Sequence, residues 1–469
     1  MKLKSLVVLM ATLTGCTMNP TYQRPPAPAP AAWPQGEAYQ TPTVGATSQI
    51  RWQAFFQDPA LRQLIDLALS NNRDLRKAAL NVAAYRAQYR IQRSEIFPEI
   101  GLDGSGARSR TPADLTEVGS HTTRGNNRVE VGLTSYELDV WGRIRSLNRS
   151  ALEVYLASDE AQRGVRIGLI ADVAVAYMTW QTDRQLLTVT RSTLANYRHN
   201  LGLVTASSDV GTASDLDVRQ ARTLVDSARG QVQAYIRQVA QDGNALRLLV
   251  GTELPAGLRS APFEGVILEE ISAGLPADLL QQRPDILAAE HQLLAANANI
   301  GAARAAFFPS ISLTASAGTA SNQLSGLFNS GSESWSFVPQ IHLPIFTGGR
   351  LKASLDYSTI QKEVSVANYE QVIQTAFREV ADGLAAKGTW DEQLMSQKDL
   401  VQSSDEYSQM AQQRYDDGVD SYLTLLDAQR QLLTARQRLL SDHLAQLTAQ
   451  VQLYKALGFG TVTSSGTSG

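Results

Sequence analysis

Apolar residues recur every three or four positions along two long stretches of the chain that contain no proline. The later stretch covers residues 348–457 and has one polar turn near its middle, at about residues 415–421. Gly418 stands where a helix can end in the left-handed conformation, and Ser421 stands where the next helix can be capped. The pattern predicts a helical hairpin whose arms of roughly 40–65 residues would run about 60–100 Å. Because a globular core of this size has no room for such arms, we expect a projecting tube or stalk.

An earlier proline-free stretch, residues 113–254, has the same design, with its turn at about residues 207–214. Four other segments instead alternate between apolar or small residues and polar ones, which is typical of half-buried strands. They are predicted at about residues 98–108, 128–140, 309–319 and 336–346. Polar connections at residues 111–127 and 321–334 separate the two members of each pair.

The chain repeats itself. Residues 74–98 match residues 285–309 at a constant offset, and both segments end in Phe-Pro. The hairpins also align without a gap, so that Gly211 corresponds to Gly418 and Ser214 to Ser421. We therefore predict a tandem duplication of helix, strand, loop, strand and helical hairpin. The first repeat covers residues 51–256 and the second residues 257–460, and residues 461–469 are predicted to form a disordered tail rich in Ser, Gly and Thr.

The N-terminus predicts export and a lipid anchor. Two lysines precede an apolar run at residues 6–13, which leads into Leu-Thr-Gly and then Cys16. This pattern is similar to a bacterial lipoprotein signal, with residues 1–15 removed and Cys16 lipidated. Thr17 in place of Asp resembles lipoproteins that are sent on to the outer membrane. Residues 16–50 would then be the lipidated end of an extended strap rich in Pro and Ala. The alternative is an ordinary signal peptide with an incidental cysteine.

Composition excludes several classes of function. The formal net charge of −3 gives no sign of a surface for nucleic acid, and the single cysteine rules out disulfides or multi-cysteine metal sites within a chain. The five histidines are scattered, and no nucleophile elbow, phosphate-binding loop or zinc-protease motif is present. We therefore expect no enzyme activity, no metal and no cofactor beyond the covalent lipid on Cys16.

Membrane crossing, if it occurs, is assigned to the strands. An acyl chain only tethers a protein, and after the signal no apolar run approaches the ~18–20 residues of a spanning helix. Four strands cannot close a barrel, and an open sheet edge in lipid leaves backbone groups unsatisfied. Strands must then be pooled from several chains, to a total of eight, twelve or more. A polar inner face would make the lumen water-filled, so that the sequence predicts an oligomeric channel-tunnel.

Several motifs resemble one known family. They are Leu-Thr-Gly-Cys ending at Cys16, residues 52–75, Tyr-Glu-Leu-Asp-Val-Trp-Gly-Arg at 136–143, Arg-Pro-Asp-Ile at 283–286, residues 296–313 and Leu-Thr-Leu-Leu-Asp-Ala-Gln at 423–429. Together the chain resembles the TolC-type outer membrane factors, and among them the lipoprotein branch that serves resistance-nodulation-division (RND) multidrug pumps.

The resemblance implies a mainly α protein with a small β part. It is expected to be a homotrimeric α/β-barrel channel-tunnel, with a twelve-stranded barrel in the outer membrane of a Gram-negative bacterium and a helical tunnel in the periplasm. Its partners would be a periplasmic adaptor protein, an inner-membrane RND transporter and the outer-membrane lipid, and its cargo drugs and other toxic solutes. Alternatives are the outer-membrane channel of a metal-efflux or type I secretion system, or a non-conducting periplasmic scaffold lipoprotein. The scaffold would fit the helices but not the four alternating strands.

The second hairpin turn is the predicted periplasmic gate. Leu423 and Asp427 are four residues apart and so lie on one face of the helix after the turn. In related channels the position of Asp427 supplies a ring of carboxylates to the aperture, and the position of Leu423 an apolar constriction. The alternative is a packed leucine and a solvated aspartate near a helix N-terminus. Spacing alone favours neither interpretation.

Related channels also hold the closed state with polar links between neighbouring hairpins. The resemblance places Asp217, Tyr415 and Asp420 at these positions. Because Asp420 replaces an arginine of other members, it cannot pair with Asp217, and we expect the link to involve another cation, one of Arg219, Arg222 and Arg414. For Asp217 the alternative is a capping box with Ser214.

Overall fold

The computed structural model describes residues 17–28, 30, 32–39, 50–117, 119–259, 268 and 283–459. The predicted signal at residues 1–15, the predicted lipidation site Cys16 and the predicted tail at residues 461–469 lie outside these described residues. Contacts divide the chain into two units. The first comprises residues 1–26, 81–159 and 288–369, and the second comprises residues 27–80, 160–287 and 370–469.

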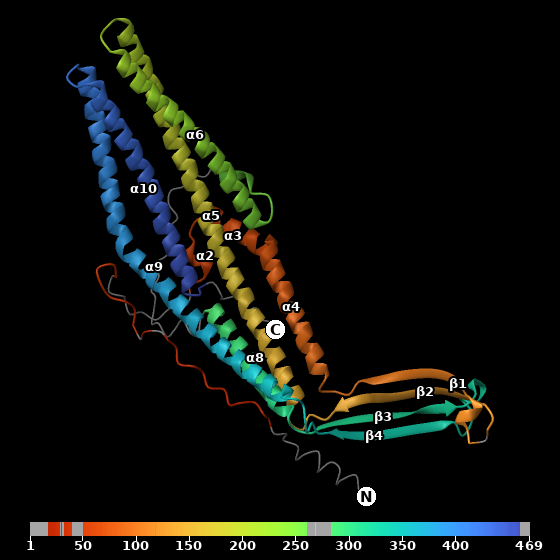
Figure 1. Cartoon of the computed structure of the whole chain (residues 1–469). Coiled ribbons are helices and arrows are strands. Elements are labelled where there is room, and N and C mark those ends of the chain that lie inside the picture. The colour runs from red at the N-terminus through yellow and green to blue at the C-terminus, as the bar shows by residue number, and fades with distance from the viewer. Residues whose placement is uncertain are drawn as a thin grey trace, which may run out of the picture. The chain divides into compact units, whose positions relative to one another are not determined.

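Two helical hairpins and one sheet make up most of the described chain (Figure 1). The helices are α2 (Trp52–Phe55), α3 (Pro59–Asn71), α4 (Arg73–Ser94), α5 (Arg143–Asp209), α6 (Asp215–Val250), α8 (Pro284–Ala305), α9 (Arg350–Asp416) and α10 (Tyr422–Ala456), with short 3-10 turns η1 (Ala113–Leu115), η2 (Ala256–Arg259) and η3 (Leu324–Gly326). The strands are β1 (Ile100–Thr111), β2 (Thr122–Glu137), β3 (Ser310–Ser321) and β4 (Glu333–His342). Helices α5 and α9 each have 67 residues, a length of about 100 Å.

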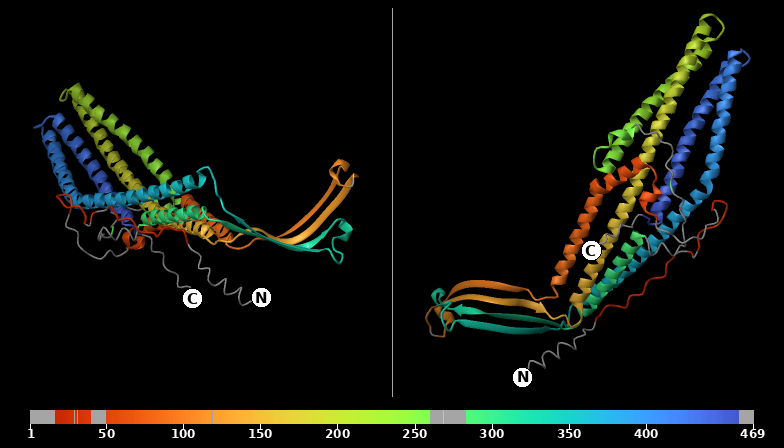
Figure 2. Two further views of the ribbon diagram at one scale, coloured as in Figure 1. Left: turned by 60° about the horizontal axis from the view of Figure 1, so that its bottom comes forward. Right: turned by 180° about the vertical axis from the view of Figure 1, so that it is seen from behind.

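The sheet in the first unit is antiparallel, in the order β1-β2-β3-β4 (Figure 2). Its register aligns Leu102 with Val131, Val131 with Ala317, and Ala317 with Trp335. Because successive side chains in a strand point to opposite faces, this row puts the apolar residues of all four strands on one face. The other face carries Asp103, Glu130, Ser316 and their neighbours. The alternation seen in the sequence therefore describes one mainly apolar face, which also carries Arg108 and Arg110 toward the far end of β1.

The limits of all four strands differ from those expected by a few residues, and two of the differences have a clear cause. Strand β2 begins at Thr122, so the connection expected at residues 111–127 is shorter, because the polar residues before Val129 continue the ladder opposite β1. Strand β4 covers Glu333–His342. Leu343 and Ile345, which were expected within it, lie beyond its end, where Pro344 has no N–H to donate to a ladder.

The second unit has an aromatic core beside its helices. Phe55 stacks on Tyr454 with 4.3 Å between ring centroids, and Trp33 of the strap stacks on Phe377 at 4.9 Å. Asp58 caps α3 by accepting from the N–H groups of Ala60 and Leu61.

The duplication extends to single hydrogen bonds. The Asn72 side chain donates to the Leu249 carbonyl at 2.8 Å, and Arg283, at the equivalent place in the second repeat, donates to the Ala456 carbonyl at 2.9 Å. Each repeat thus ties the end of its returning helix, α6 or α10, to the start of the helix that precedes its strands, α4 or α8.

Among the described helices, none is both long enough and apolar enough to cross a membrane.

Candidate functional site

The turns at the ends of the two hairpins share one backbone arrangement. In the first, Gly211 has φ +81°, and the N–H groups of Gly211 and Thr212 donate to the carbonyls of Ser208 and Ser207. In the second, Gly418 has φ +72° and donates to the Tyr415 carbonyl, while Val419 donates to the Arg414 carbonyl. Both are Schellman motifs, which need a residue with positive φ and therefore favour glycine.

The first turn leads into a complete capping box. The Ser214 hydroxyl accepts from the Asp217 N–H at 3.2 Å, and Asp217 Oδ2 accepts from the Ser214 N–H at 3.0 Å and from its hydroxyl at 2.7 Å. The interpretation of Asp217 as a capping residue is confirmed. Its carboxylate is engaged within its own turn.

The second turn is held by an ion pair instead. Ser421 precedes α10 but makes no capping bond with its side chain. Arg414 binds Asp420 with two hydrogen bonds, Nε to Oδ2 at 2.7 Å and Nη2 to Oδ1 at 3.0 Å. This contact lowers the pKa of the Asp420 carboxyl below its ordinary value. Of the three candidate cations, Arg414 therefore neutralises Asp420, within the same hairpin.

An apolar cluster joins the two hairpins near their turns. Its buried members come from α5, α6, α9 and α10: Val204, Ala221, Ala411, Tyr422, Leu425, Leu426 and Ala428. The rings of Tyr415 and Tyr422 lie 5.3 Å apart. Burial raises the pKa of Tyr422 to about 12, with smaller contributions from Tyr415 and from the charge of Asp217. The pKa of Tyr415 is raised by burial first and then by the charge of Asp217.

The charge of Asp217 acts on both Tyr415 and Tyr422, so the three residues lie near one another at the end of the hairpins. Sequence reasoning missed Tyr422, although its place as the first residue of α10, three before Leu425, was a helical signal. Asp420 is turned to Arg414 and is held apart from this group.

Leu423 and Asp427 have different surroundings. The Leu423 side chain is 61% exposed in the single chain, and the equivalent residue of the first hairpin, Leu216, is 65% exposed. The Asp427 carboxylate accepts at 2.5 Å from Arg430 and at 2.5 Å from Gln431, both on its own helix. An exposed leucine and a hydrogen-bonded carboxylate therefore lie one turn apart on α10.

The first hairpin also contains a pair of carboxyl groups farther from its turn. Asp183 on α5 and Asp242 on α6 are close enough for each to act on the other. The pKa of Asp183 is raised to about 7, by burial first and then by its hydrogen bond to Asp242 and the charge of that group. Gln238 donates to Asp242 Oδ1 at 2.9 Å, and Asp242 Oδ2 is buried. At the equivalent positions the second hairpin has Trp390 and Ala449.

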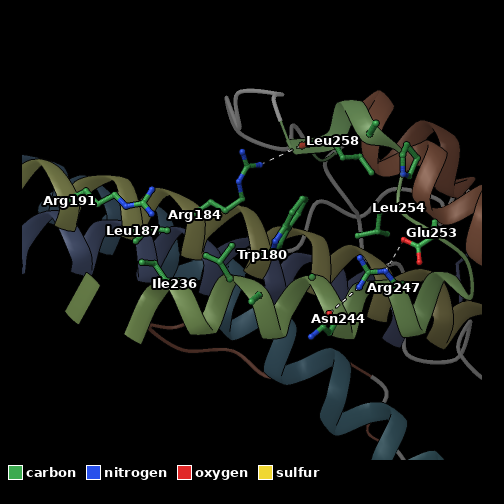
Figure 3. Close-up of a pocket in the computed structure, with 15 residues that line it drawn as sticks. Trp180, Arg184, Leu187, Arg191, Ile236, Asn244, Arg247, Glu253, Leu254 and Leu258 are labelled. Atoms are coloured by element: carbon green, nitrogen blue, oxygen red, sulfur yellow. Dashed lines mark hydrogen bonds and ion pairs between the residues drawn. The ribbon is translucent and has the colours of Figure 1, made fainter. Parts of the chain in front are cut away.

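A cavity of about 680 Å³ lies between α5, α6 and η2 (Figure 3). The Arg184 guanidinium lies 5.0 Å from the ring centroid of Trp180 and donates to the Gln181 side chain. Arg247 binds Glu253 at 3.1 Å and the Asn244 side chain at 3.0 Å (Figure 3). Both arginines are therefore engaged by neighbouring side chains. Among the described residues, no group of three or more His, Cys, Asp or Glu side chains is placed to hold a metal ion.

The chain is similar to known efflux proteins over nearly its whole length. The family model described as "Outer membrane efflux protein" matches residues 64–252 and 275–459, one segment in each repeat. The chain is 57% identical to the solvent efflux pump outer membrane protein SrpC of Pseudomonas putida, over 98% of this chain and 99% of that protein. It is 44% identical to the outer membrane protein OprJ of Pseudomonas aeruginosa, over 97% of this chain and 95% of that protein.

Solved structures agree with this result. A membrane protein from Pseudomonas aeruginosa has a TM-score of 0.89 and 43% identity, covering 95% of this chain and 98% of that one. The open state of the MtrE outer membrane channel of Neisseria gonorrhoeae has a TM-score of 0.85 and 36% identity, covering 95% of this chain and 99% of that one. The resemblance to TolC-type channels is confirmed, together with the efflux-channel function and the outer-membrane location. The chain belongs to the outer membrane efflux protein family.

Proposed function

We propose that three copies of this chain form a passive exit duct for organic solvents and antibiotics, working with a periplasmic adaptor and an inner-membrane RND transporter. The observation that carries the proposal is the sheet. Its apolar face is uncovered in the single chain: Leu102 is 72% exposed, Trp335 81% and Ile341 72%. Among the described strands, the outer edges of β1 and β4 have no neighbour. A face and two edges of this kind are stable only when lipid covers the face and other copies pair with the edges.

Three copies supply twelve strands, and their polar faces would line a lumen wet enough for solutes. The relatives support the cargo, since one of them is named a solvent efflux pump protein and others are named for toluene and antibiotic efflux. Transport of this kind needs no catalytic group and no cofactor. The lipid on Cys16 would add a tether, and Cys16→Ala should abolish acylation while the trimer persists.

We also propose that the periplasmic end is closed at the second hairpin turn, by Leu423 and Asp427 from three copies. Exposure of Leu423 and the nearby polar groups of Asp427 and Arg430 support a constriction that can open without unfolding. Tyr415 and Asp217 would contribute to holding the hairpins closed, and Asp420 would act through Arg414. In planar bilayers, Leu423→Ala with Asp427→Ala should conduct more than the wild type. Equal conductance would exclude this gate.

A matched pair of variants in β1 tests the channel itself. Leu102→Asp puts a charge on the apolar face, whereas Ser105→Asp puts the same charge on the polar face, opposite Arg128. A charge on a lipid face opposes insertion by up to about 2–4 kcal/mol, somewhat less for Asp. We expect Leu102→Asp to lose outer-membrane trimers and tolerance to toluene and antibiotics, and Ser105→Asp to keep both. A Leu102→Asp protein that still forms trimers and restores tolerance would contradict the proposal.

A further inference from the structure

A cavity of about 580 Å³ lies in the second unit at the elbow between α3 and α4, beside α5. Three guanidinium groups line it, together with three side-chain amides: Arg73, Arg76, Arg166, Asn71, Asn72 and Gln162. None of the residues that line it is acidic, and Asp74, between Arg73 and Leu75 on α4, is not among the lining residues. A cavity walled by three cations and no anion has an unbalanced charge.

The three arginines have no counter-ion within the described chain. Each of the ion pairs found there joins other residues, and Glu160, six residues before Arg166 on α5, accepts a hydrogen bond from Arg163 at 3.0 Å. Arg166 Nε is buried and has no hydrogen-bond acceptor. Leaving a buried charged donor without an acceptor is unfavourable, so this nitrogen marks a place where an acceptor is missing.

The second repeat shows that the fold does not need these charges. At the positions equivalent to Arg73, Arg76 and Arg166 it has Pro284, Leu287 and Ile373. Pro284 is buried and Ile373 is only 2% exposed, so the equivalent region of the second repeat is packed apolar structure.

The one cation of that region is fully paired. Arg283 binds Asp285 at 2.6 Å and Glu379 at 2.8 Å. One repeat thus neutralises its guanidinium group internally, while the other gathers three and neutralises none of them within the described chain.

The elbow holds the cavity in a fixed shape. The Asn72 side chain donates to the Leu249 carbonyl and accepts from the Leu75 N–H at 2.9 Å, which ties the start of α4 to the end of α6. Helix α4 has 22 residues, and the amide groups of its first turn carry partial positive charge, which Asp74 in the same turn partly offsets. The Asn72 amide is therefore held in place before any ligand arrives, while the Arg73 and Arg76 side chains are exposed.

We propose that this cavity binds an oxyanion of the phosphate class, held by Arg73, Arg76 and Arg166. The planar guanidinium group matches a phosphate with two parallel hydrogen bonds, and Arg166 Nε supplies a donor that has no other acceptor. The cavity is larger than one phosphate ion needs, so it also has room for a phosphate ester of a small alcohol or sugar. Binding would join α3, α4 and α5 through one ligand and stiffen the elbow.

Calorimetric titration of the full-length protein in detergent, at low salt, tests this directly. The probes are inorganic phosphate and glycerol 1-phosphate. We expect saturable binding of one anion per chain, weakened roughly tenfold or more in Arg166→Gln, since a charge-assisted bond contributes about 1.5–3 kcal/mol. The matched control is Arg191→Gln, which removes the same charge from an exposed site on the same helix and should bind as the wild type does. Tighter binding of glycerol 1-phosphate would identify an ester or headgroup as the ligand, and equal binding would identify free phosphate.

The second variant is Arg76→Gln, whose side chain is exposed and whose folding is not at risk. It should also weaken binding, and phosphate should raise the melting temperature of the wild type more than that of either variant. The proposal is overturned if phosphate does not bind, or if it binds equally to wild type, Arg76→Gln and Arg166→Gln. It is also overturned if the wild type does not bind phosphate and the oligomer dissociates in the two variants. The arginines would then pair with carboxylates of a second copy. None of these results depends on conduction, so the channel proposal stands or falls separately.

Discussion

In the turn between α5 and α6, a serine and an aspartate cap the following helix, whereas in the turn between α9 and α10 an arginine and an aspartate bind each other across the turn. The backbone is the same in both, down to the carbonyls of Ser207 and Arg414, each of which accepts two N–H groups. Duplication has kept the part that only glycine can supply, because positive φ strains other residues. The polar side chains could diverge, because any donor and acceptor of suitable reach can satisfy an exposed turn.

The largest expected difference between the hairpins lies at the first residue of the returning helix. Tyr422 is 5% exposed in the cluster that joins the hairpins, while its equivalent, Asp215, is exposed. Tyr422→Ala should destabilise the protein by about 3–5 kcal/mol, and Asp215→Ala should change stability by no more than about 0.5 kcal/mol. Thermal unfolding in detergent measures both, with Tyr422→Phe as the control that keeps the ring. Similar losses for Tyr422→Ala and Asp215→Ala would mean that the cluster does not hold the hairpins together.

The next difference is in pH dependence. The pKa of Asp183 is raised to about 7, so the folded protein holds this proton more tightly than the unfolded chain does. The stabilisation is complete below the ordinary pKa of an aspartate, about 4, and is lost as the pH rises through 7. The melting temperature should therefore fall between pH 4 and pH 8 by less in Asp183→Asn than in the wild type. Asp226→Asn, on the surface of α6, serves as the control, and a wild-type profile retained by Asp183→Asn would show that Asp183 titrates normally.

A smaller effect is expected at the N-caps. Ser214→Ala removes a capping bond and should cost about 1 kcal/mol, whereas Ser421→Ala removes no such bond and should cost only a few tenths. Hydrogen exchange of the first-turn amides of α6 and α10 measures each helix end separately. Ser214→Thr should keep the protection of α6. If the two alanine variants lost the same amount of amide protection, the capping box would not stabilise α6.

The smallest effect on stability is expected from the ion pair of the second turn, because Arg414 is exposed to water and Asp420 is partly exposed. Arg414→Gln and Asp420→Asn should each loosen the amides of Val419 and Asp420, and the double variant should add little. Since the pKa of Asp420 is lowered by Arg414, the contact should weaken as the pH falls below about 4. If either single variant destabilised the protein as much as Tyr422→Ala, Arg414 or Asp420 would have a second partner, in another copy of the chain.

Much of this fold could be read from single residues. Gly211 and Gly418 marked the turns, and the alternation around Val131 marked one face of a strand. These signals are local, because a helix end or a strand face depends on residues within a few positions of each other. The start of β2 could not be read in this way. Its first residues are polar, and only pairing with β1 makes them a strand.

The sequence by itself determined the duplication, the glycine turns and the one-sided strands of this channel. All three follow from spacing along the chain and from what a backbone allows. Only the tertiary structure decided that Arg414 rather than Arg219 meets Asp420, that Tyr422 lies between the hairpins, and that Arg73, Arg76 and Arg166 share one cavity. These contacts join residues on different helices or across a turn. Each such contact contributes little to the total free energy of folding. The sequence therefore needs no recurring pattern to encode it.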